Sequence, residues 1–297
     1  MQSNKDGRVV VSSSMGGTLW KIGGRAIDLA QNGLIMGVLN VTPDSFSDGG
    51  HFFSIEKAIE RGLQMVSEGA GVIDVGGEST RPGARPISEK EELERVLPVI
   101  AGLREKVPVP ISIDTSKAGV ALRALEAGAS IVNDVTAGRS DPEMMPLIAK
   151  KKVAFIIMHM QGTPQTMQTN PSYDDVVGEV ADFFRQQYAC ALKCGIDCMG
   201  IAFDPGIGFG KTVEHNLELL ANLSRLRVDD RPIVIGVSRK SFLGKIIGST
   251  KMGDRLAATI ALTAILRERG AHILRVHDVK ENAAALQVAE RLFAVTK

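Results

Sequence analysis

The stretch LIMGVLNVTPDSFSDGG, residues 34–50, joins a nearly continuous apolar run to a polar, turn-rich loop. The apolar run is short and ends at Asn40, which predicts a strand buried on both faces. The loop offers Asp44, Asp48, hydroxyl groups and glycine amides, with Phe46 as its apolar tip. Parallel α/β proteins place their chemistry at such strand ends. We therefore expect a functional site here, provided that the pattern recurs along the chain.

Seven further apolar runs end in polar residues in the same way. They lie at residues 71–83, 109–116, 129–136, 153–164, 200–211, 232–244 and 272–279. Eight strand-and-helix units in about 265 residues match an α/β fold of the (β/α)8 type, the TIM barrel. A doubly wound open sheet is the alternative, because pattern alone does not show closure. Eight polar strand ends favour the barrel, which gathers every strand end around one mouth.

Two segments precede the first long strand. Residues 1–17 are polar and rich in Ser and Gly, so we expect a loose, flexible N-terminal extension. Residues 18–29 alternate around Gly23 and Gly24, which predicts an N-terminal β-hairpin that plugs one end of the barrel. We find no composition break after this hairpin, and residues 18–297 are predicted to form a single domain.

Helix start signals follow several of the strands. Ser54 is expected to cap a helix that ends at Gly69. Ser88 is expected to begin a capping box, with Glu91 at the third position. A long helical segment is predicted over residues 173–195.

The charge balance excludes several classes of function. With 35 basic and 34 acidic residues the formal net charge is +1, which argues against a nucleic-acid or membrane-surface binder. We find no membrane-spanning run or signal peptide, and we expect a cytoplasmic protein. Cys190, Cys194 and Cys198 are four residues apart. We interpret them as buried small residues of a reducing compartment rather than as a metal site.

The strand ends supply an unusual set of polar side chains. Any one of them would more often be a helix cap or part of a salt bridge, such as one between Asp204 and Lys240. Buried carboxylates need donors or a cationic partner, and two of them with an amide suit a flat heterocycle that carries an amino group and ring N–H donors. The set comprises Asn40, Asp114, Asn133, Asp204, Lys240, Arg275 and His277.

A second group of residues favours an anion. Arg81, Arg275 and His277, with glycine amides of the loops, are suited to a diphosphate. Asn40 offers an oxygen to a Mg²⁺ ion held mainly by phosphate and water. His159 ends the fifth strand, where packing and catalysis are equally plausible. GIGFGKT, residues 206–212, misses the phosphate-binding P-loop by one position, so we assign this loop to the barrel mouth.

The chain from Ile35 to its C-terminus resembles the dihydropteroate synthase family of folate biosynthesis. The resemblance is carried by a specific, ordered set of motifs: NVTPDSFSDGG, GGESTRPG, SIDT, IVNDV, MHMQGTP, FDPGIGFGK, GVSRKSF and RVHDV. It implies a transferase that joins p-aminobenzoate to 6-hydroxymethyl-7,8-dihydropterin diphosphate, with Mg²⁺ on the leaving diphosphate. It also implies dissociative substitution at the pterin methylene, and sulfonamides as competitive inhibitors.

The resemblance also implies a role for each matching residue. The implied catalytic residues are Asp48, Asp114, Lys240, Arg275 and His277. The implied pterin pocket consists of Asp114, Asn133, Met158, Asp204, Gly236, Lys240 and Arg275. The implied p-aminobenzoate side consists of Phe46, Asp48, Thr80, Arg81, Pro82, Phe209, Lys240 and Ser241. The implied diphosphate side consists of Asn40, Arg81, Arg275 and His277, with Asn40 as the metal ligand.

Two other functions compete with this interpretation. One is a pterin-binding barrel of the methyltetrahydrofolate-dependent methyltransferases, which has no diphosphate to bind. The other is a non-catalytic pterin-binding protein, which loss of a charged site residue would signal. The family also implies a homodimer, for which the apolar helical segments at residues 256–266 and 283–295 are candidates.

Overall fold

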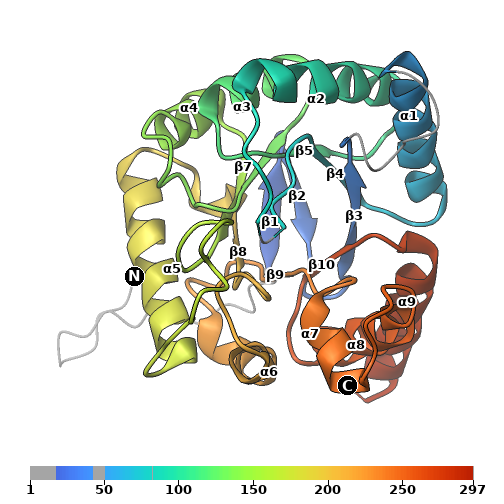
Figure 1. Ribbon diagram of the computed structural model, residues 1–297, viewed down its shortest axis with the longest axis vertical. Coiled ribbons are helices and arrows are strands. Elements are labelled where there is room, and N and C mark those ends of the chain that lie inside the picture. Colours follow the sequence, from blue (N-terminus) through green and yellow to red (C-terminus); the bar gives the residue numbers. More distant parts are fainter. Residues whose placement is uncertain (1–17, 43–50, 82, 297) are drawn as a thin grey trace, which may run out of the picture.

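Eight parallel strands form the barrel of this protein (Figure 1). The computed structural model describes residues 18–42, 51–81 and 83–296. Hydrogen-bonded neighbours follow the order β8-β7-β6-β5-β4-β3-β10-β9, and a parallel bridge between Phe203 and Ile233 joins the two ends. The predicted TIM barrel is therefore confirmed. The strands are β3 (Leu34–Asn40), β4 (Val72–Gly76), β5 (Ile111–Asp114), β6 (Ile131–Asp134), β7 (Ala154–Met158), β8 (Ile201–Asp204), β9 (Val234–Ile235) and β10 (Ile273–Val276).

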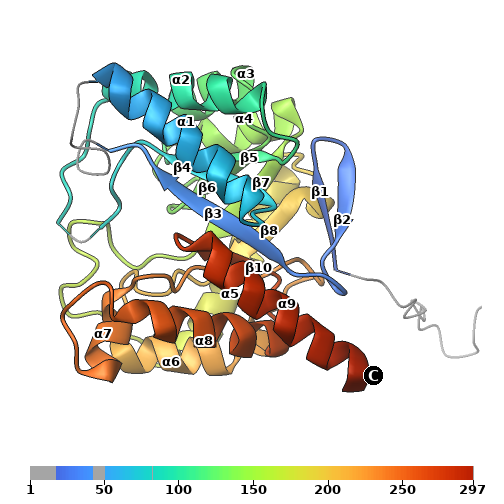
Figure 2. The ribbon, with the colours of Figure 1, turned by 90° about the vertical axis from the view of Figure 1, so that its right-hand side faces the viewer.

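Helices surround the strands on the outside of the barrel (Figures 1 and 2). Apolar side chains from both layers pack into a continuous core, which contains Ile73, Ile113 and Phe203. In the described part of the chain the α-helices are α1 (His51–Ser67), α2 (Glu89–Arg104), α3 (Ala118–Glu126), α4 (Met144–Lys151), α5 (Val176–Lys193), α6 (Val213–Ala221), α7 (Ser241–Ile247), α8 (Arg255–Glu268) and α9 (Val279–Thr296). Within the described residues, no helix is long and apolar enough to cross a bilayer.

The helix boundaries refine the expectations from sequence. The Ser88 side chain accepts a hydrogen bond from the Glu91 amide, as predicted, but Glu91 pairs with Arg95 instead of closing a capping box. Helix α1 begins at His51, three residues before the expected Ser54 cap. A residue that is favoured at the N-cap does not prevent a helix from starting earlier in the chain. Helix α5 is shorter than predicted, because Asp175 caps it by accepting from Gly178 N.

The prediction that the three cysteines are buried was wrong. Helix α5 ends at Lys193, so Cys190, Cys194 and Cys198 do not share one helical face. Cys190 and Cys194 are exposed and Cys198 is partly exposed, and all three are free thiols. Small size and weak polarity favour burial of cysteine but do not decide it, because the neighbouring elements determine which side of a helix is covered.

The parallel register aligns the strand ends in two rows, which lie two residues apart along the strands. Asn40 aligns with Gly76, Gly76 with Asp114, Asp114 with Asn133, and Met158 with Asp204. Polar residues that are far apart in the sequence therefore meet at the mouth of the barrel.

An antiparallel hairpin covers the opposite end, where the strands begin (Figure 2). It consists of β1 (Leu19–Ile22) and β2 (Arg25–Asp28), joined by Gly23 and Gly24 in left-handed conformations. Trp20 is fully buried against the first residues of the barrel strands, including Met36 and Val72. Its indole N–H donates to Gly200 O at 2.9 Å. The hairpin is therefore the plug that the sequence predicted.

Replacing Trp20 tests how much this plug stabilises the barrel. We expect Trp20→Ala to lower the free energy of unfolding by about 3–5 kcal/mol, because it leaves a large cavity. Trp20→Phe keeps an aromatic ring but loses the hydrogen bond to Gly200, and it should cost less than half as much. Equilibrium unfolding in urea measures both values, and similar small losses in the two variants would contradict the plug's contribution.

Candidate active site

A pocket opens among the strand ends at the barrel mouth. It contains nine residues that the sequence analysis assigned to ligand binding, together with Val135. These residues come from seven strand-end segments, all at the carboxyl ends of the parallel strands. The lining consists of Thr80, Asp114, Asn133, Val135, Met158, Asp204, Phe209, Gly236, Lys240 and Arg275.

Arg275 is held by two carboxylates at the base of this pocket. Its Nε donates to Asp74 Oδ2 and its second terminal nitrogen to Asp114 Oδ2, each at 2.6 Å. Asp74 is completely buried and also accepts from Asn133 Nδ2 at 3.1 Å. Asp74 therefore positions both a cation and an amide of the pocket.

The sequence analysis missed Asp74. It lies inside the apolar run of β4 and not at its end, and the pattern of polar strand ends does not select it. A charged residue in the middle of a buried strand was the available signal, because such a residue needs a partner.

Burial changes the protonation of the acidic groups. Desolvation raises the pKa of Asp114 to about 7, with Arg275 opposing the shift and Asp74 adding to it. Burial likewise raises the pKa of Asp204, although Lys240 opposes this. Asp204 accepts a hydrogen bond from Gly206 N at 2.7 Å. The two carboxyls face the same pocket in different hydrogen-bonding environments.

Lys240 does not pair directly with Asp204. Its Nζ donates to the Ile207 carbonyl and lies 4.6 Å from the centre of the Phe209 ring. Burial lowers the pKa of Lys240 to about 8, with Asp204 opposing the shift. The absence of a side chain at Gly236 leaves space next to Lys240. A Cβ at this position would be in van der Waals contact with both Lys240 Nζ and Arg275 Cβ, at 3.9 Å from each.

Asn40, the last residue of β3, and His277, directly after β10, are not part of the pocket lining. A Cβ at Gly76 would be 3.7 Å from both Asn40 Oδ1 and Asp114 Oδ2, which places these two side chains around one gap. A hydrogen bond of 3.1 Å joins His277 Nδ1 to Ser238 Oγ. Burial, with Arg275 adding to it, lowers the pKa of His277 to about 3, so the free site holds a neutral imidazole.

The remaining predicted residues have different positions. Arg81 is exposed, and Ser241 is an exposed residue at the start of α7. Phe46, Asp48 and Pro82 lie outside the described residues. His159 is buried but is not part of the pocket lining; it contacts Lys211 instead.

The donor set at the mouth suits a metal bound mostly by its substrate. Among the described residues, no three His, Cys, Asp or Glu side chains are placed to hold a metal ion. Asn40 Oδ1 at the gap beside Gly76 is an oxygen donor of the kind that Mg²⁺ accepts, with phosphate and water completing the shell. The residues present are thus compatible with a Mg²⁺ that arrives with a diphosphate.

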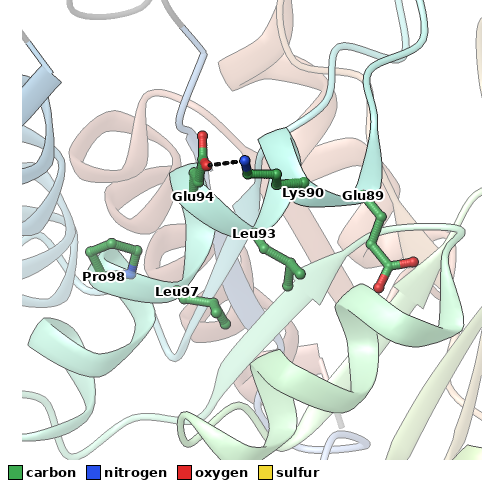
Figure 3. Close-up of a pocket in the computed structure, with 6 residues that line it drawn as sticks. All are labelled: Glu89, Lys90, Leu93, Glu94, Leu97 and Pro98. Atoms are coloured by element: carbon green, nitrogen blue, oxygen red, sulfur yellow. Dashed lines mark ion pairs between the residues drawn. The ribbon is translucent and has the colours of Figure 1, made fainter.

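A second hollow lies on α2, outside the barrel (Figure 3). It measures about 580 Å³ and is bordered by Leu93, Leu97 and Pro98, with Glu89 and the Lys90–Glu94 ion pair at its rim. It has no convergent buried polar groups, and its lining does not overlap with that of the mouth.

Comparisons with known proteins agree with this fold. The model of the pterin binding enzyme family matches residues 36–277. Dihydropteroate synthase of Synechocystis is 45% identical over 272 residues, covering 92% of this chain and 94% of that protein. The fold and the matching family model define a pterin-binding enzyme of the TIM-barrel class.

Solved structures narrow this class further. Yersinia pestis dihydropteroate synthase, solved with a sulfonamide drug complex, superposes with a TM-score of 0.87 at 40% identity, covering 93% of this chain and 99% of that one. The Xanthomonas albilineans enzyme with 4-aminobenzoic acid gives 0.87 at 41% identity, covering 94% and 99%. The chain belongs to the dihydropteroate synthase family.

Asp74 offers a test of the electrostatics at the pocket base. We expect Asp74→Asn to lower the free energy of unfolding by about 2 kcal/mol, because Arg275 loses a buried partner while Asp114 remains. The matched control is Asp197→Asn, which removes the half-exposed ion pair with Lys21 and should cost less than about 1 kcal/mol. Urea unfolding of both variants makes the comparison, and equal losses would contradict the role of Asp74.

Proposed function

We propose that the barrel mouth catalyses the dihydropteroate synthase reaction. In it, p-aminobenzoate displaces diphosphate from 6-hydroxymethyl-7,8-dihydropterin diphosphate to give 7,8-dihydropteroate. The observation that carries the proposal is the pocket itself, where two buried carboxyls, one amide, one lysine and one arginine converge. Membership of the dihydropteroate synthase family supports the same reaction.

The pterin occupies the deeper part of the pocket. Asp114 and Asp204 accept from the ring N–H and amino groups, while Asn133 presents its amide, whose nitrogen already donates to Asp74. Lys240 serves a ring carbonyl or nitrogen after leaving the Ile207 carbonyl. Met158 and Gly236 provide the apolar and open walls that a flat ring requires.

The diphosphate lies toward β3 and β10. Arg275, Arg81 and His277 bind its oxygens, and Asn40 completes the side that holds Mg²⁺. When bound, the magnesium ion neutralises charge on the leaving diphosphate. A diphosphate beside His277 favours the protonated imidazole. Substrate binding is therefore expected to raise the pKa of His277 above its value in the free site.

The chain's residues support a dissociative substitution without a protein nucleophile. Arg275 and His277 stabilise the departing diphosphate, and Asp114 stabilises the pterin cation that remains. The neutral amine of p-aminobenzoate then forms the new C–N bond and releases its proton. We assign the arylamine side to Thr80, Arg81, Phe209, Lys240 and Ser241, together with Phe46, Asp48 and Pro82 beyond the described residues.

Sulfonamides compete for the arylamine side. The support is the similarity to the Yersinia pestis synthase solved with a sulfonamide drug and to the Xanthomonas albilineans synthase solved with 4-aminobenzoic acid. The methyltransferase alternative is disfavoured, because Asn40, Arg275 and His277 form a diphosphate side that a methyltransferase does not need. A non-catalytic barrel is disfavoured because every charged residue of the described site is present.

Assembly and location complete the proposal. The chain forms a homodimer through late apolar helices, where Ile265 of α8 and Leu292 of α9 are exposed. Light scattering at micromolar concentration should give about twice the chain mass of 31.7 kDa, and a monomer mass would contradict this. We place the protein in the cytoplasm, since the exposed free thiols of Cys190 and Cys194 suit a reducing compartment.

Diphosphate release tests the reaction directly. The full chain is incubated with the dihydropterin diphosphate and Mg²⁺, with and without p-aminobenzoate, and dihydropteroate is measured by mass spectrometry. Release that requires p-aminobenzoate and yields dihydropteroate is expected. Pterin binding without any release would contradict the synthase function and favour a binding protein or a methyltransferase-like barrel.

The raised pKa of Asp114 predicts an acid limb in the pH profile. As pH falls through about 7, Asp114 becomes protonated and no longer acts as the anion that pairs with Arg275 or stabilises the pterin cation. We expect kcat/KM for the pterin substrate to fall about tenfold per pH unit below that value.

Asp114→Asn is the matching variant. It should lower kcat/KM by about 100-fold and flatten the acid limb, because the charge is lost at every pH. Its free energy of unfolding should change far less than its activity does. Wild-type turnover in this variant would refute the assignment.

A further inference from the structure

Lys211 is a buried lysine directly behind the pocket wall. Only 3% of its surface is exposed, and its Nζ lies 3.1 Å from Gly206 O, 2.9 Å from Phe209 O and 3.0 Å from His159 Nδ1. Burial lowers the pKa of Lys211 to about 7, with Lys240 adding to the shift and Asp204 opposing it. In its protonated form the side chain has three N–H donors, and these three acceptors use all of them. Lys211 does not line the pocket, and the reaction described above gives it no part.

His159 serves as an acceptor for this ammonium group. Burial, with the charge of Lys211 adding to it, lowers the pKa of His159 to about 2. The ring is therefore neutral, and an Nδ1 that accepts from Lys211 leaves its proton on Nε2. The backbone amide of His159 donates to Asp204 O at 2.9 Å, and the ring packs edge-on against Phe183.

Lys211 and Lys240 hold the same loop from opposite sides. Residues 206–210 connect β8 to the segment before α6. Lys211 binds the Gly206 and Phe209 carbonyls, while Lys240 binds the Ile207 carbonyl and lies over the Phe209 ring. The two lysines thus bind three of the five loop carbonyls; Gly208 O accepts from Gln168 and Gly210 O from the Tyr173 hydroxyl.

The loop also fits tightly against the segment that follows β7. Gly206 and Gly210 have positive φ values of 64° and 62°. A Cβ would lie 1.9 Å from His159 O at Gly206 and 2.6 Å from Gln161 O at Gly210. Neither position accommodates another residue, so the loop packs closely against this segment, and Lys211 is one of the groups that satisfy its buried carbonyls.

We propose that Lys211 is a positioning residue for p-aminobenzoate, because its ammonium group fixes the 206–210 loop and with it the Phe209 ring. The inference rests on the proposed function, which places Phe209 on the arylamine side. Without the charge, the Gly206 and Phe209 carbonyls lose a buried donor and turn toward other partners. The arylamine wall is then disordered, while Asp114, Asn133 and Arg275 keep their own contacts.

Lys211→Met is the variant that tests this inference. Methionine keeps the length and burial of the side chain but removes all three donors. We expect the KM for p-aminobenzoate to rise about tenfold or more, from the loss of buried hydrogen bonds, with the KM for the pterin substrate changed less than about threefold. Lys193→Met, an exposed substitution on α5, is the matched control and should leave both KM values unchanged.

A purely structural role gives a different result. If Lys211→Met lowers thermal stability but leaves both KM values of the folded enzyme unchanged, or raises them equally, the inference is overturned. If the wild-type chain forms no dihydropteroate, the proposed function fails first and the inference with it. Normal wild-type turnover with an unaltered variant overturns the inference alone.

His159 provides a second pair of variants if Lys211→Met does not fold. His159→Gln retains a side-chain oxygen that accepts from Lys211, whereas His159→Phe retains an aromatic ring but no acceptor. The KM for p-aminobenzoate should be higher in His159→Phe than in the wild type. In His159→Gln it should lie closer to the wild-type value. Equal KM values in these two variants and the wild type would overturn the inference.

Discussion

The guanidinium group of Arg275, shared between Asp74 and Asp114, is the interaction on which the barrel mouth depends. It joins β10 to β4 and β5 across the top of the barrel, where charges could not be buried without partners. Asp74 contributes no direct surface to the pocket, yet it orients Arg275 and Asn133 together. Asp114 is the more readily exchanged of the two partners. Burial raises its pKa, with Asp74 adding to the shift, and a ligand with N–H donors can replace its contact with Arg275.

This electrostatic arrangement requires a barrel that is apolar at one end and polar at the other. At the closed end, Trp20 of the hairpin fills the space among the first residues of the strands. At the mouth, the parallel register aligns Asn40, Asp114 and Asn133 in one row across the sheet, and Asp204 lies two residues further along its strand. Apolar packing at the closed end therefore stabilises the barrel, while polar and charged side chains occupy the mouth.

The sequence predicted the barrel and most of the pocket because both follow from position along the chain. Apolar runs that end in Asp or Asn indicate strand ends, and a closed barrel brings such ends together whatever their partners are. The contacts between side chains from different strands could not be predicted in this way. The Asp74–Arg275 pair and the Lys211–His159 contact join residues 201 and 52 positions apart, and no local pattern indicates them. The exposure of Cys190 was mispredicted for the same reason, since it depends on which face of α5 its neighbours cover.

The side of the mouth that we assign to the arylamine combines two differently held segments. Lys211 and Lys240 hold residues 206–210 from both sides, which makes Phe209 a preformed surface. On the other side, Lys117 pairs with Glu78 at 2.5 Å and with buried Glu92 at 2.6 Å, at the start of the segment that carries Arg81. Arg81 itself is exposed. A preformed wall lowers the entropic cost of ordering the site when a substrate binds. The ion pairs of Lys117 restrict the segment that carries Arg81, so fewer residues remain to be ordered when p-aminobenzoate binds.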